Sequence, residues 1–262
     1  MLPPNLTAVE ACPIGDGLHI RPTPRVPAGR GGLDFVDRER GGPVLDSGRA
    51  ASVRHTFFIE RFMSLTIFDK GENNVIDVDP RDQDNQAGKI YINGDNNYIR
   101  IGRGCISDKD MHIVIESNGR FDVGDDVRLS MANIYVGPGS VLRIGDRTGF
   151  TGLVHLNPVE TKAIEIGSDC SIASGVWMTT SDFHSIISRT GGTRLNPAKS
   201  VRVGNHVWIA NHATLLKGSV IGDNAIIGAH AVVTGTVPPH CVAAGNPARI
   251  VREDVTWRSD LI

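Results

Sequence analysis

Six aliphatic residues recur at an unbroken spacing of six near the end of the chain: Val203, Ile209, Leu215, Ile221, Ile227 and Val233. An α-helix repeats every 3.6 residues and a flat strand every two, so neither element explains this period. A fixed, longer period is typical of a fold that stacks short repeats. We therefore predict that each hexad is a short strand plus a turn, and that three hexads form one triangular coil of 18 residues.

Two other positions of the hexad agree with such a coil. The fifth residue is always Val, Ala or Ser, as expected for a side chain that points inward near a corner. Gly204, Gly222 and Gly228 follow the inward aliphatic residue, where the backbone turns with little room for a Cβ atom. Strands of successive coils stack about 4.8 Å apart. The predicted fold class is all-β, a parallel β-helix.

A looser repeat precedes the strict one. Its anchors Ile101, Val123, Ile144 and Ile166 are 22, 21 and 22 residues apart, which corresponds to 18-residue coils with three or four extra residues. From Ile166 onward the spacing of six is regular. The early coils are therefore expected to be irregular, with loops that line a substrate groove.

A 24-residue segment, Thr179–Arg202, interrupts the register before it resumes at Val203. A long loop on a rigid scaffold is a common place for functional residues. We predict three parts: a Pro/Gly-rich N-terminal arm (1–55), a β-helix domain (56–252) with its insertion at 179–202, and a C-terminal cap (253–262). The arm holds seven of the fourteen prolines. The cap is expected to contain a short helix from about Glu253.

Composition excludes some functions. A net charge of −2 gives no general attraction to nucleic acid or to anionic membranes. No segment approaches 18 consecutive apolar residues, and the N-terminus lacks a basic region followed by an apolar run. Cys105 and Cys170 occupy the small inward position, and no cysteine pair has metal-ligand spacing. A cytoplasmic protein without membrane insertion or a bound metal is the expectation.

The histidines separate into two kinds. His206, His212 and His230 occupy the outward fourth position of their hexads, and the last two are 18 residues apart, so they should stack one coil apart. His184 lies in the insertion. Its imidazole, with an ordinary pKa of about 6.5, is suited to removing a proton from a hydroxyl. Asp182 is the nearest carboxylate that holds the imidazole tautomer, or else it caps a turn.

The segment VGNHVWIANHATLLKGSVIGDNAIIGAHAVVTGTVPPHCVAAGNPARIV, preceded by a histidine-bearing loop, resembles the hexapeptide-repeat acyltransferases. The sugar and capsular polysaccharide O-acetyltransferases are closest. The resemblance is strong from Ile166 to Val251, weak over 90–165 and absent before 70. It implies a left-handed β-helix, against the general preference for right-handed crossovers. It also implies a homotrimer with active sites between subunits.

The resemblance assigns roles by position. The family's catalytic histidine falls on His184, and its acetyl-CoA contacts fall on Asn211, Ala229 and Thr234. Asn211 and Ala229 are 18 residues apart and should lie one above the other along a single edge. Such an edge suits a long ligand that runs parallel to the column.

The family's two arginines that follow the repeat fall on Arg249 and Arg252, near the end of the column, where they could pair with the phosphates of coenzyme A. Forked guanidinium donors suit that task, although two surface arginines of a cap would look the same. The family often has Gly and Lys where this chain has Ala210 and Gly235. Lys217 is either a substitute for the missing lysine or a solvated surface residue.

Trp208 should project away from the narrow core. Its indole could stack near the thioester of the donor, cover a loop of a neighbouring subunit, or have a packing role alone. Contacts to the acceptor are expected from the irregular coils, with Asn157 and Glu160 as candidates. The acceptor itself is not defined by the sequence.

The predicted function is an acetyl-CoA-dependent O-acetyltransferase that acts on a sugar or a surface polysaccharide precursor, with His184 as general base and direct transfer. An N-acyltransferase on an amino sugar or a nucleotide sugar is the alternative. Two other hypotheses are a carbonic anhydrase with zinc on His206, His212 and His230, and a β-helix scaffold without activity.

Overall fold

The computed structural model describes residues 64–79, 81–82 and 86–262, and these residues form strands and turns with no helix. They lie within one unit, Phe58–Ile262. The predicted arm, residues 1–55, is outside the described residues. No helix in the described part of the chain has the length and apolarity to cross a bilayer.

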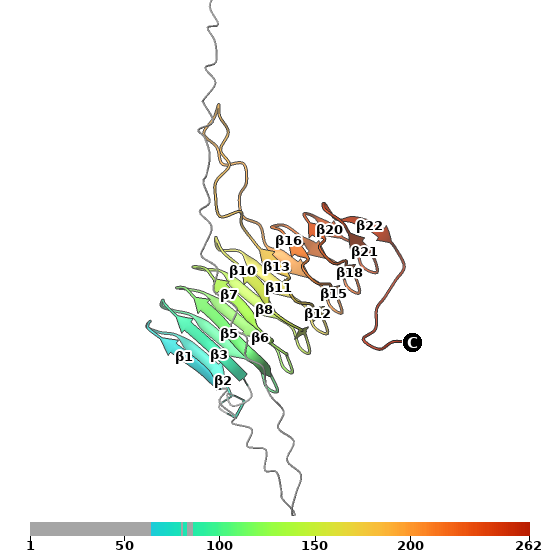
Figure 1. Cartoon of the computed structure of the whole chain (residues 1–262). Coiled ribbons are helices and arrows are strands. Elements are labelled where there is room, and N and C mark those ends of the chain that lie inside the picture. The colour runs from blue at the N-terminus through green and yellow to red at the C-terminus, as the bar shows by residue number, and fades with distance from the viewer. Residues whose placement is uncertain (1–63, 80, 83–85) are drawn as a thin grey trace, which may run out of the picture. The chain divides into compact units, whose positions relative to one another are not determined.

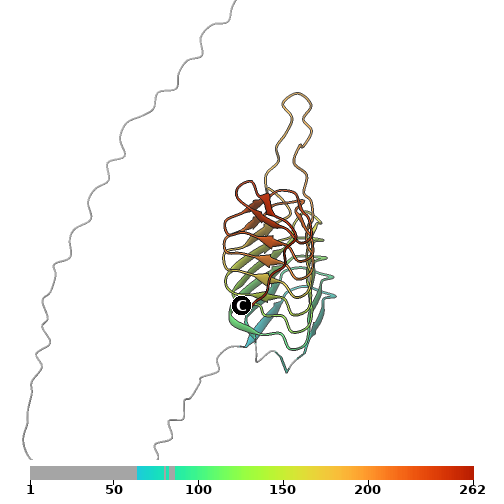
Figure 2. The ribbon, with the colours of Figure 1, turned by 90° about the vertical axis from the view of Figure 1, so that its right-hand side faces the viewer.

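Three parallel sheets form the sides of a column (Figures 1 and 2). Sheet A contains β1 (Leu65–Asp69), β3 (Gln86–Ile92), β5 (Ser107–Ile115), β7 (Ala132–Val136), β10 (Val154–Asn157), β13 (Trp177–Thr179), β16 (Thr214–Leu215) and β19 (Val232–Val233). Sheet B contains β2 (Val75–Val78), β4 (Tyr98–Ile101), β6 (Arg120–Val123), β8 (Val141–Ile144), β11 (Ala163–Ile166), β14 (Val201–Val203), β17 (Val220–Ile221) and β20 (Thr236–Val237). Sheet C contains β9 (Gly149–Phe150), β12 (Ser171–Ile172), β15 (Trp208–Ile209), β18 (Ile226–Ile227), β21 (Val242–Ala244) and β22 (Arg249–Arg252).

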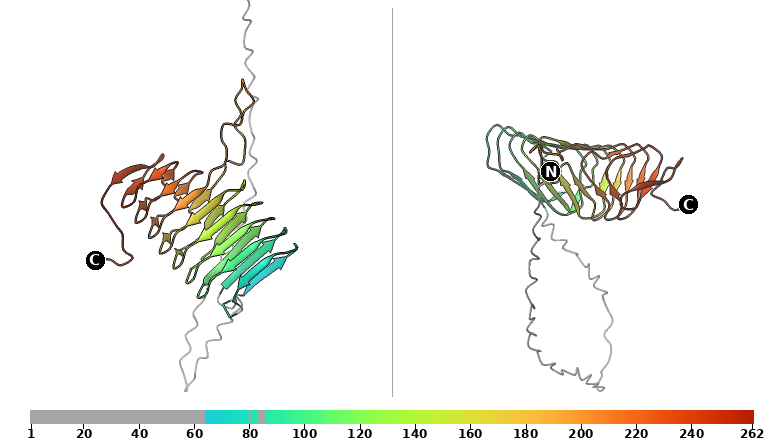
Figure 3. Two further views of the ribbon diagram at one scale, coloured as in Figure 1. Left: turned by 180° about the vertical axis from the view of Figure 1, so that it is seen from behind. Right: turned by 90° about the horizontal axis from the view of Figure 1, so that it is seen from above.

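The complete coils run through sheets A, B and C in turn, and each strand pairs with the equivalent strand one coil away, as Figure 3 shows from two sides. This arrangement is the predicted left-handed parallel β-helix. The looser repeat is also confirmed, because Ile101, Val123, Ile144 and Ile166 lie in register on adjacent strands of sheet B and are buried. The same row continues through Val203.

The hexad positions behave as predicted. All six first-position aliphatic residues are buried, and so are the six small residues at the fifth position: Val207, Ala213, Ser219, Ala225, Ala231 and Val237. Cys105 and Cys170 point into the same core, and burial raises the pKa of the Cys105 thiol to about 11. The column is therefore held together mainly by stacked aliphatic side chains.

The glycine at position 204, which follows an inward-pointing aliphatic residue, is required by a close contact with the next coil. A Cβ on Gly204 would lie 2.2 Å from the Asp223 carboxylate of the next coil. That carboxylate accepts a hydrogen bond from the Asn205 backbone N–H at 2.7 Å. Asp223 thus caps the turn of the coil before it, and only a glycine at position 204 leaves the space that its side chain needs.

The early coils are irregular because their extra residues lengthen sheet A. Strands β3 and β5 have seven and nine residues, whereas later strands of this sheet have two or three. Sheet C begins only at β9, so the first coils have two regular sides.

The predicted short helix from Glu253 is wrong. Strand β22 pairs antiparallel with β21 at the end of sheet C, and residues 253–262 continue as irregular backbone. Val255 donates to the His240 carbonyl at 3.0 Å, and the Trp257 indole N–H donates to the His206 carbonyl at 2.8 Å. A helix this short is marginal in water, and these tertiary contacts favour an extended path along the column.

Candidate functional site

The insertion leaves sheet A after Thr179 and returns at Val201, on the edge that joins sheets A and B. Its two limbs run antiparallel and project from the column (Figure 1). Leu195 donates to the Ile186 carbonyl at 2.7 Å, and Ser188 donates to the Thr193 carbonyl at 2.9 Å. We refer to residues 180–200 as the insertion hairpin.

Glu160 anchors the second limb of the hairpin to the preceding coil. Its carboxylate accepts two hydrogen bonds from the Arg194 guanidinium, at 2.5 and 2.9 Å, and a third from the Ser181 hydroxyl. The Arg194 contact and then the Ser181 contact lower the pKa of Glu160 to about 2. Glu160, predicted to contact the acceptor, is therefore engaged within the protein at the base of the hairpin.

A second anchor joins the hairpin to the following coil. Lys217 Nζ lies 2.5 Å from Asp182 Oδ2 and donates to the Asn196 carbonyl at 3.0 Å. The Lys217 contact, followed by an Asn196 hydrogen bond, holds the pKa of the Asp182 carboxyl below its usual range. The Lys217 side chain is 17% exposed, so it is not a solvated surface lysine. The Asp182 carboxylate faces Lys217 and Asn196.

Asn196 holds the backbone on both sides of His184. Its amide nitrogen donates to the His184 carbonyl at 2.8 Å and to Asp182 Oδ2 at 2.6 Å, and its amide oxygen accepts from the Ile186 N–H at 2.7 Å. Asn196 is buried, whereas His184 is exposed. The sequence analysis missed Asn196. The Asn-Pro dipeptide in RLNPAK was an available signal, because such dipeptides mark turns.

The hairpin also carries an apolar surface. Phe183, Ile186, Ile187 and Leu195 are each more than half exposed in the single subunit. Large apolar side chains gathered on a protruding segment are typical of a surface that contacts another chain. His184 lies between two of these residues in the sequence.

The edge that joins sheet C to sheet A holds other predicted residues. Asn211 and Ala229 lie on the turns after β15 and β18, and His230 donates to the Asn211 carbonyl at 3.0 Å. The His212 and His230 rings are stacked with centroids 5.0 Å apart, which confirms the predicted one-coil spacing. Backbone and side chains on this edge are exposed over two successive coils.

Thr234 and Arg249 come together at the end of the column. Both line a cavity of about 230 Å³, with Gly235, Ala248 and Ile250 among its other residues. Arg252 is exposed at the far end of β22. Thr234 lies after β19, on the edge between sheets A and B, so the residues predicted to bind acetyl-CoA lie along two edges of one subunit.

Trp208 lies on sheet C and is partly covered by the C-terminal segment. Its ring centroid is 6.3 Å from that of Trp257, which itself stacks on His206 at 4.6 Å. Sequence analysis singled out Trp208 but missed Trp257. Within the subunit, Trp208 therefore contacts Trp257, which is 49 positions later in the sequence and lies in the irregular C-terminal segment.

The carbonic anhydrase hypothesis needs three converging histidines. His206 lies on the edge between sheets B and C, with Nδ1 2.9 Å from Asn224 Oδ1, whereas His212 and His230 lie on a different edge. Among the described residues, no group of three or more His, Cys, Asp and Glu side chains has a geometry that could hold a metal ion.

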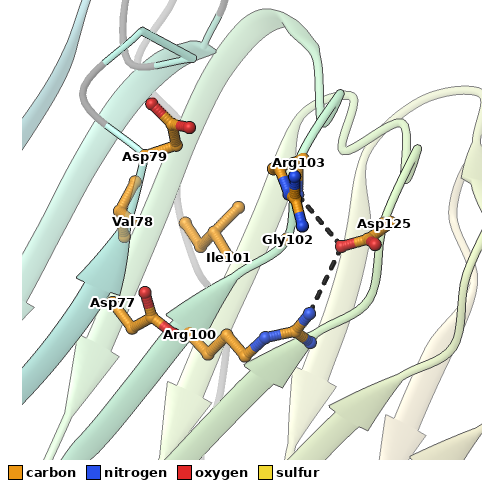
Figure 4. Close-up of a pocket in the computed structure, with 8 residues that line it drawn as sticks. All are labelled: Asp77, Val78, Asp79, Arg100, Ile101, Gly102, Arg103 and Asp125. Atoms are coloured by element: carbon orange, nitrogen blue, oxygen red, sulfur yellow. Dashed lines mark hydrogen bonds and ion pairs between the residues drawn. The ribbon is translucent and has the colours of Figure 1, made fainter.

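Sheet B carries a ladder of charges. Its outward residues alternate in sign along adjacent strands in register: Asp77, Arg100, Asp122, Arg143, Glu165 and Arg202. A cavity of about 390 Å³ lies at the first strands of this face (Figure 4), where Asp125 accepts from the Arg100 guanidinium at 3.2 Å and from the Arg103 backbone at 3.0 Å. These charges satisfy one another, and the cavity lies at the coils of β2 and β4, before the coil that carries the hairpin.

Comparison with known proteins places this architecture in a family. Residues 200–235 match the family model described as bacterial transferase hexapeptide (six repeats). A polysialic acid O-acetyltransferase of Neisseria meningitidis is 33% identical over 198 residues, which cover 72% of this chain and 87% of that protein. One from Escherichia coli O1:K1 is 38% identical over 94 residues, 36% of this chain, and the match spans only 31% of the relative's length. The solved structure of the polysialic acid O-acetyltransferase OatWY is 30% identical, with a TM-score of 0.65, over 76% of this chain and 92% of that one.

Proposed function

The chain belongs to the bacterial hexapeptide-repeat acyltransferases, among the sugar and polysaccharide O-acetyltransferases, and from this premise we propose that it transfers an acetyl group from acetyl-CoA to a hydroxyl of a polysaccharide or its precursor. The observation that carries the proposal is the setting of His184. Its backbone is fixed by buried Asn196, while the residue itself is exposed on an anchored hairpin.

In this proposal His184 is the general base. Its imidazole accepts the proton of the acceptor hydroxyl while that oxygen attacks the thioester carbonyl, and it then returns the proton to the departing thiolate. The new carbon–oxygen bond forms first and gives a tetrahedral intermediate, and the carbon–sulfur bond breaks as this intermediate collapses, so no covalent enzyme intermediate is needed. An oxyanion forms between the two steps, and the backbone N–H groups of Trp208 and Ala210 are not free to stabilise it, because they donate to the Ala225 and Ile227 carbonyls of the next coil.

Asp182 acts as a positioning residue in this scheme. Its carboxylate binds Lys217 and Asn196, and these contacts hold the first limb of the hairpin beside the column. Glu160 performs the same task for the second limb through Arg194. Together the anchors restrict the positions that the His184 backbone can adopt, which supports a base held ready for its substrate.

The donor site is proposed to lie between subunits of a homotrimer. Asn211 and Ala229 follow the edge between sheets C and A, whereas the hairpin starts from the edge between sheets A and B. Two neighbouring subunits can bring these edges together, and the exposed apolar residues of the hairpin then contact the neighbour. The pantetheine arm would follow the Asn211 edge, and Thr234, Arg249 and Arg252 would serve its phosphate end.

Substitution of the proposed base tests the function. Turnover is measured as thiol release from acetyl-CoA with sialic acid oligomers, maltodextrins and amino sugars as acceptors. Treatment of the products with mild alkali, which cleaves esters but not amides, separates O- from N-acylation. We expect His184→Ala to lower kcat by about 10²- to 10⁴-fold. Coenzyme A should still raise the melting temperature of this variant, because the donor contacts remain.

Arg189→Ala, at the exposed tip of the same hairpin, is the matched control and should retain wild-type turnover. Near wild-type turnover in His184→Ala would refute the assigned base. Failure of every acceptor with the wild-type protein would refute the proposed reaction.

A further inference from the structure

The C-terminal segment, residues 253–262, packs along the edge between sheets B and C. After β22 it turns back along the column (Figure 1). The Val255 N–H donates to the His240 carbonyl at 3.0 Å, and the Val255 carbonyl oxygen lies 3.2 Å from His240 Nδ1. The segment is thus tied to the turn between β20 and β21 before it reaches Trp257.

Trp257 is fixed to the column by its ring and by its indole N–H. The N–H donates to the His206 carbonyl at 2.8 Å, and the ring stacks on the His206 imidazole with centroids 4.6 Å apart and planes inclined by 10°. His206 is tied in turn to the following coil, because its Nδ1 lies 2.9 Å from Asn224 Oδ1. The hydrogen bond and the stacked rings together hold Trp257 in one orientation.

The Trp208 indole is the next ring in this row. It is 41% exposed, and its centroid lies 6.3 Å from that of Trp257 with planes inclined by 45°. A tilted pair at this distance is a favourable aromatic geometry, and a fixed neighbour restricts the rotamers that an exposed side chain can adopt. Within the described part of the chain, Trp257 is the one ring that contacts Trp208.

Trp208 can offer a hydrogen-bond donor to the proposed reaction only through its side chain. Its backbone N–H donates to the Ala225 carbonyl at 3.0 Å. The indole N–H, in contrast, makes no hydrogen bond to any residue that the structure describes. Strand β15 leads from Trp208 to Asn211 on the proposed donor edge. The orientation of this exposed indole therefore matters for the groups that react beside that edge.

We propose that Trp257 is a positioning residue, which holds the Trp208 indole in the orientation that acetyl transfer requires. This inference rests on the proposed function and extends the machinery of the reaction to the C-terminal segment. Trp257 lies beyond the stretch that resembles the family, which ends at Val251. It need not touch the donor or the acceptor, because it acts through Trp208.

Steady-state kinetics of Trp257→Ala test the inference, with Arg258→Ala as the matched control in the same segment. The Arg258 side chain lines a cavity of about 640 Å³ and, among the described residues, its guanidinium pairs only with Asp260. We expect Trp257→Ala to lower kcat about tenfold and to leave the KM for acetyl-CoA within about twofold. Trp257→Phe, which keeps a ring beside Trp208, should recover most of the lost kcat. Arg258→Ala should retain the wild-type values.

A double-mutant cycle separates a positioning role from a general loss of stability. Trp208→Ala should lower kcat more than Trp257→Ala does. In the Trp208→Ala background, Trp257→Ala should change kcat by less than about twofold, because the side chain through which it acts is gone. Multiplication of the two losses would overturn the inference, and so would wild-type kcat in either single variant. Thermal unfolding verifies that each variant is folded at the assay temperature.

A measurement without turnover separates this inference from the proposed function. The chain has three tryptophans, so fluorine NMR of protein labelled with fluorotryptophan gives a resonance for Trp208 that single substitutions assign. We expect Trp257→Ala to shift and broaden this resonance, since the indole loses its neighbour and gains rotamers, and Arg258→Ala to leave it unchanged. An unchanged Trp208 resonance in Trp257→Ala overturns the inference even where the wild-type protein is active. Failure of the wild-type protein to acetylate any acceptor refutes the proposed function instead, whatever the resonance shows.

Discussion

Sheets A and B each have eight strands in the same stack of coils, yet their outer faces use opposite chemistry. On sheet B, Glu165 lies 2.9 Å from the Arg143 guanidinium and 3.0 Å from that of Arg202, so one carboxylate serves two neighbouring coils. On sheet A, Asn133 and Asn157 have no such partner among the described residues. The same backbone therefore supports a face whose charged groups pair with each other and a face that carries polar side chains without such partners in the single subunit.

The difference shows how a repetitive fold separates stability from binding. A ladder that alternates in sign favours one register, because a shift by one coil would place like charges opposite each other. Each exposed pair contributes little, about 0.2–1 kcal/mol. The charge ladder therefore affects the choice of strand register more than it affects the total stability of the column. Sheet A lacks such a ladder, because neither of its outward columns of residues contains an acidic side chain.

The largest effect is expected from replacing one asparagine in the insertion that follows a strand of sheet A, and one in the turn that follows a strand of sheet B. Asn196→Ala frees the backbone around His184, and we expect kcat to fall about 10- to 100-fold with little change in the KM for acetyl-CoA, because small displacements of a base cost rate. The matched variant is Asn205→Ala, which loses the hydrogen bond from the Ser168 N–H at 2.9 Å at the end of sheet B. It should lower the melting temperature and leave kcat unchanged.

Steady-state kinetics of the two variants measure kcat, and thermal unfolding measures their melting temperatures. Equal losses of kcat in the two variants would contradict a positioning role for Asn196.

A charge reversal on sheet B should break the ladder. Glu165→Lys places three cations on adjacent strands, between Arg143 and Arg202, and we expect it to lower the free energy of unfolding by about 1 kcal/mol. His155→Lys, in the same coil but on sheet A, meets no charged neighbour in register and should change stability by less than about 0.5 kcal/mol. Denaturant unfolding at low and high salt measures the free energy of unfolding of both variants. A salt-independent loss in Glu165→Lys would contradict an electrostatic cause.

The smallest expected effect is the acid response of the hairpin at the end of sheet A. Arg194 and Ser181 lower the pKa of Glu160 to about 2, below its ordinary value of 4.5. The anchor therefore contributes fully above about pH 4.5, and its contribution is lost as the pH falls toward 2. The acids of the sheet B ladder pair with arginines of neighbouring strands and hold no inserted segment.

Hydrogen exchange of the hairpin amides, corrected for intrinsic rates, should rise between these pH values in the wild-type protein. Glu160→Gln should show the raised exchange already at neutral pH, with the rest of the column unchanged. Protection that is equal in the two proteins at neutral pH would show that the Glu160 anchor does not hold the hairpin.

Much of the fold could be predicted because it is periodic. Val203 and Ile221 occupy equivalent positions one coil apart, and the structure pairs them in register on β14 and β17. The stacking of His212 on His230 followed from the same count of 18. The location of His184 on a protruding insertion also followed, since the register breaks there. The sequence analysis went wrong where periodicity ended: it predicted a helix at Glu253, where the chain has none.

The sequence by itself determined the coil, its inward residues and the place of the insertion, because these depend on spacings of six and 18 that every strand repeats. Only the tertiary structure decided which groups hold the insertion and the tail. Glu160 meets Arg194 across 34 residues, and His206 meets Trp257 across 51. Such pairs form where a non-periodic segment folds back on the column, and no regular spacing in the sequence encodes that path.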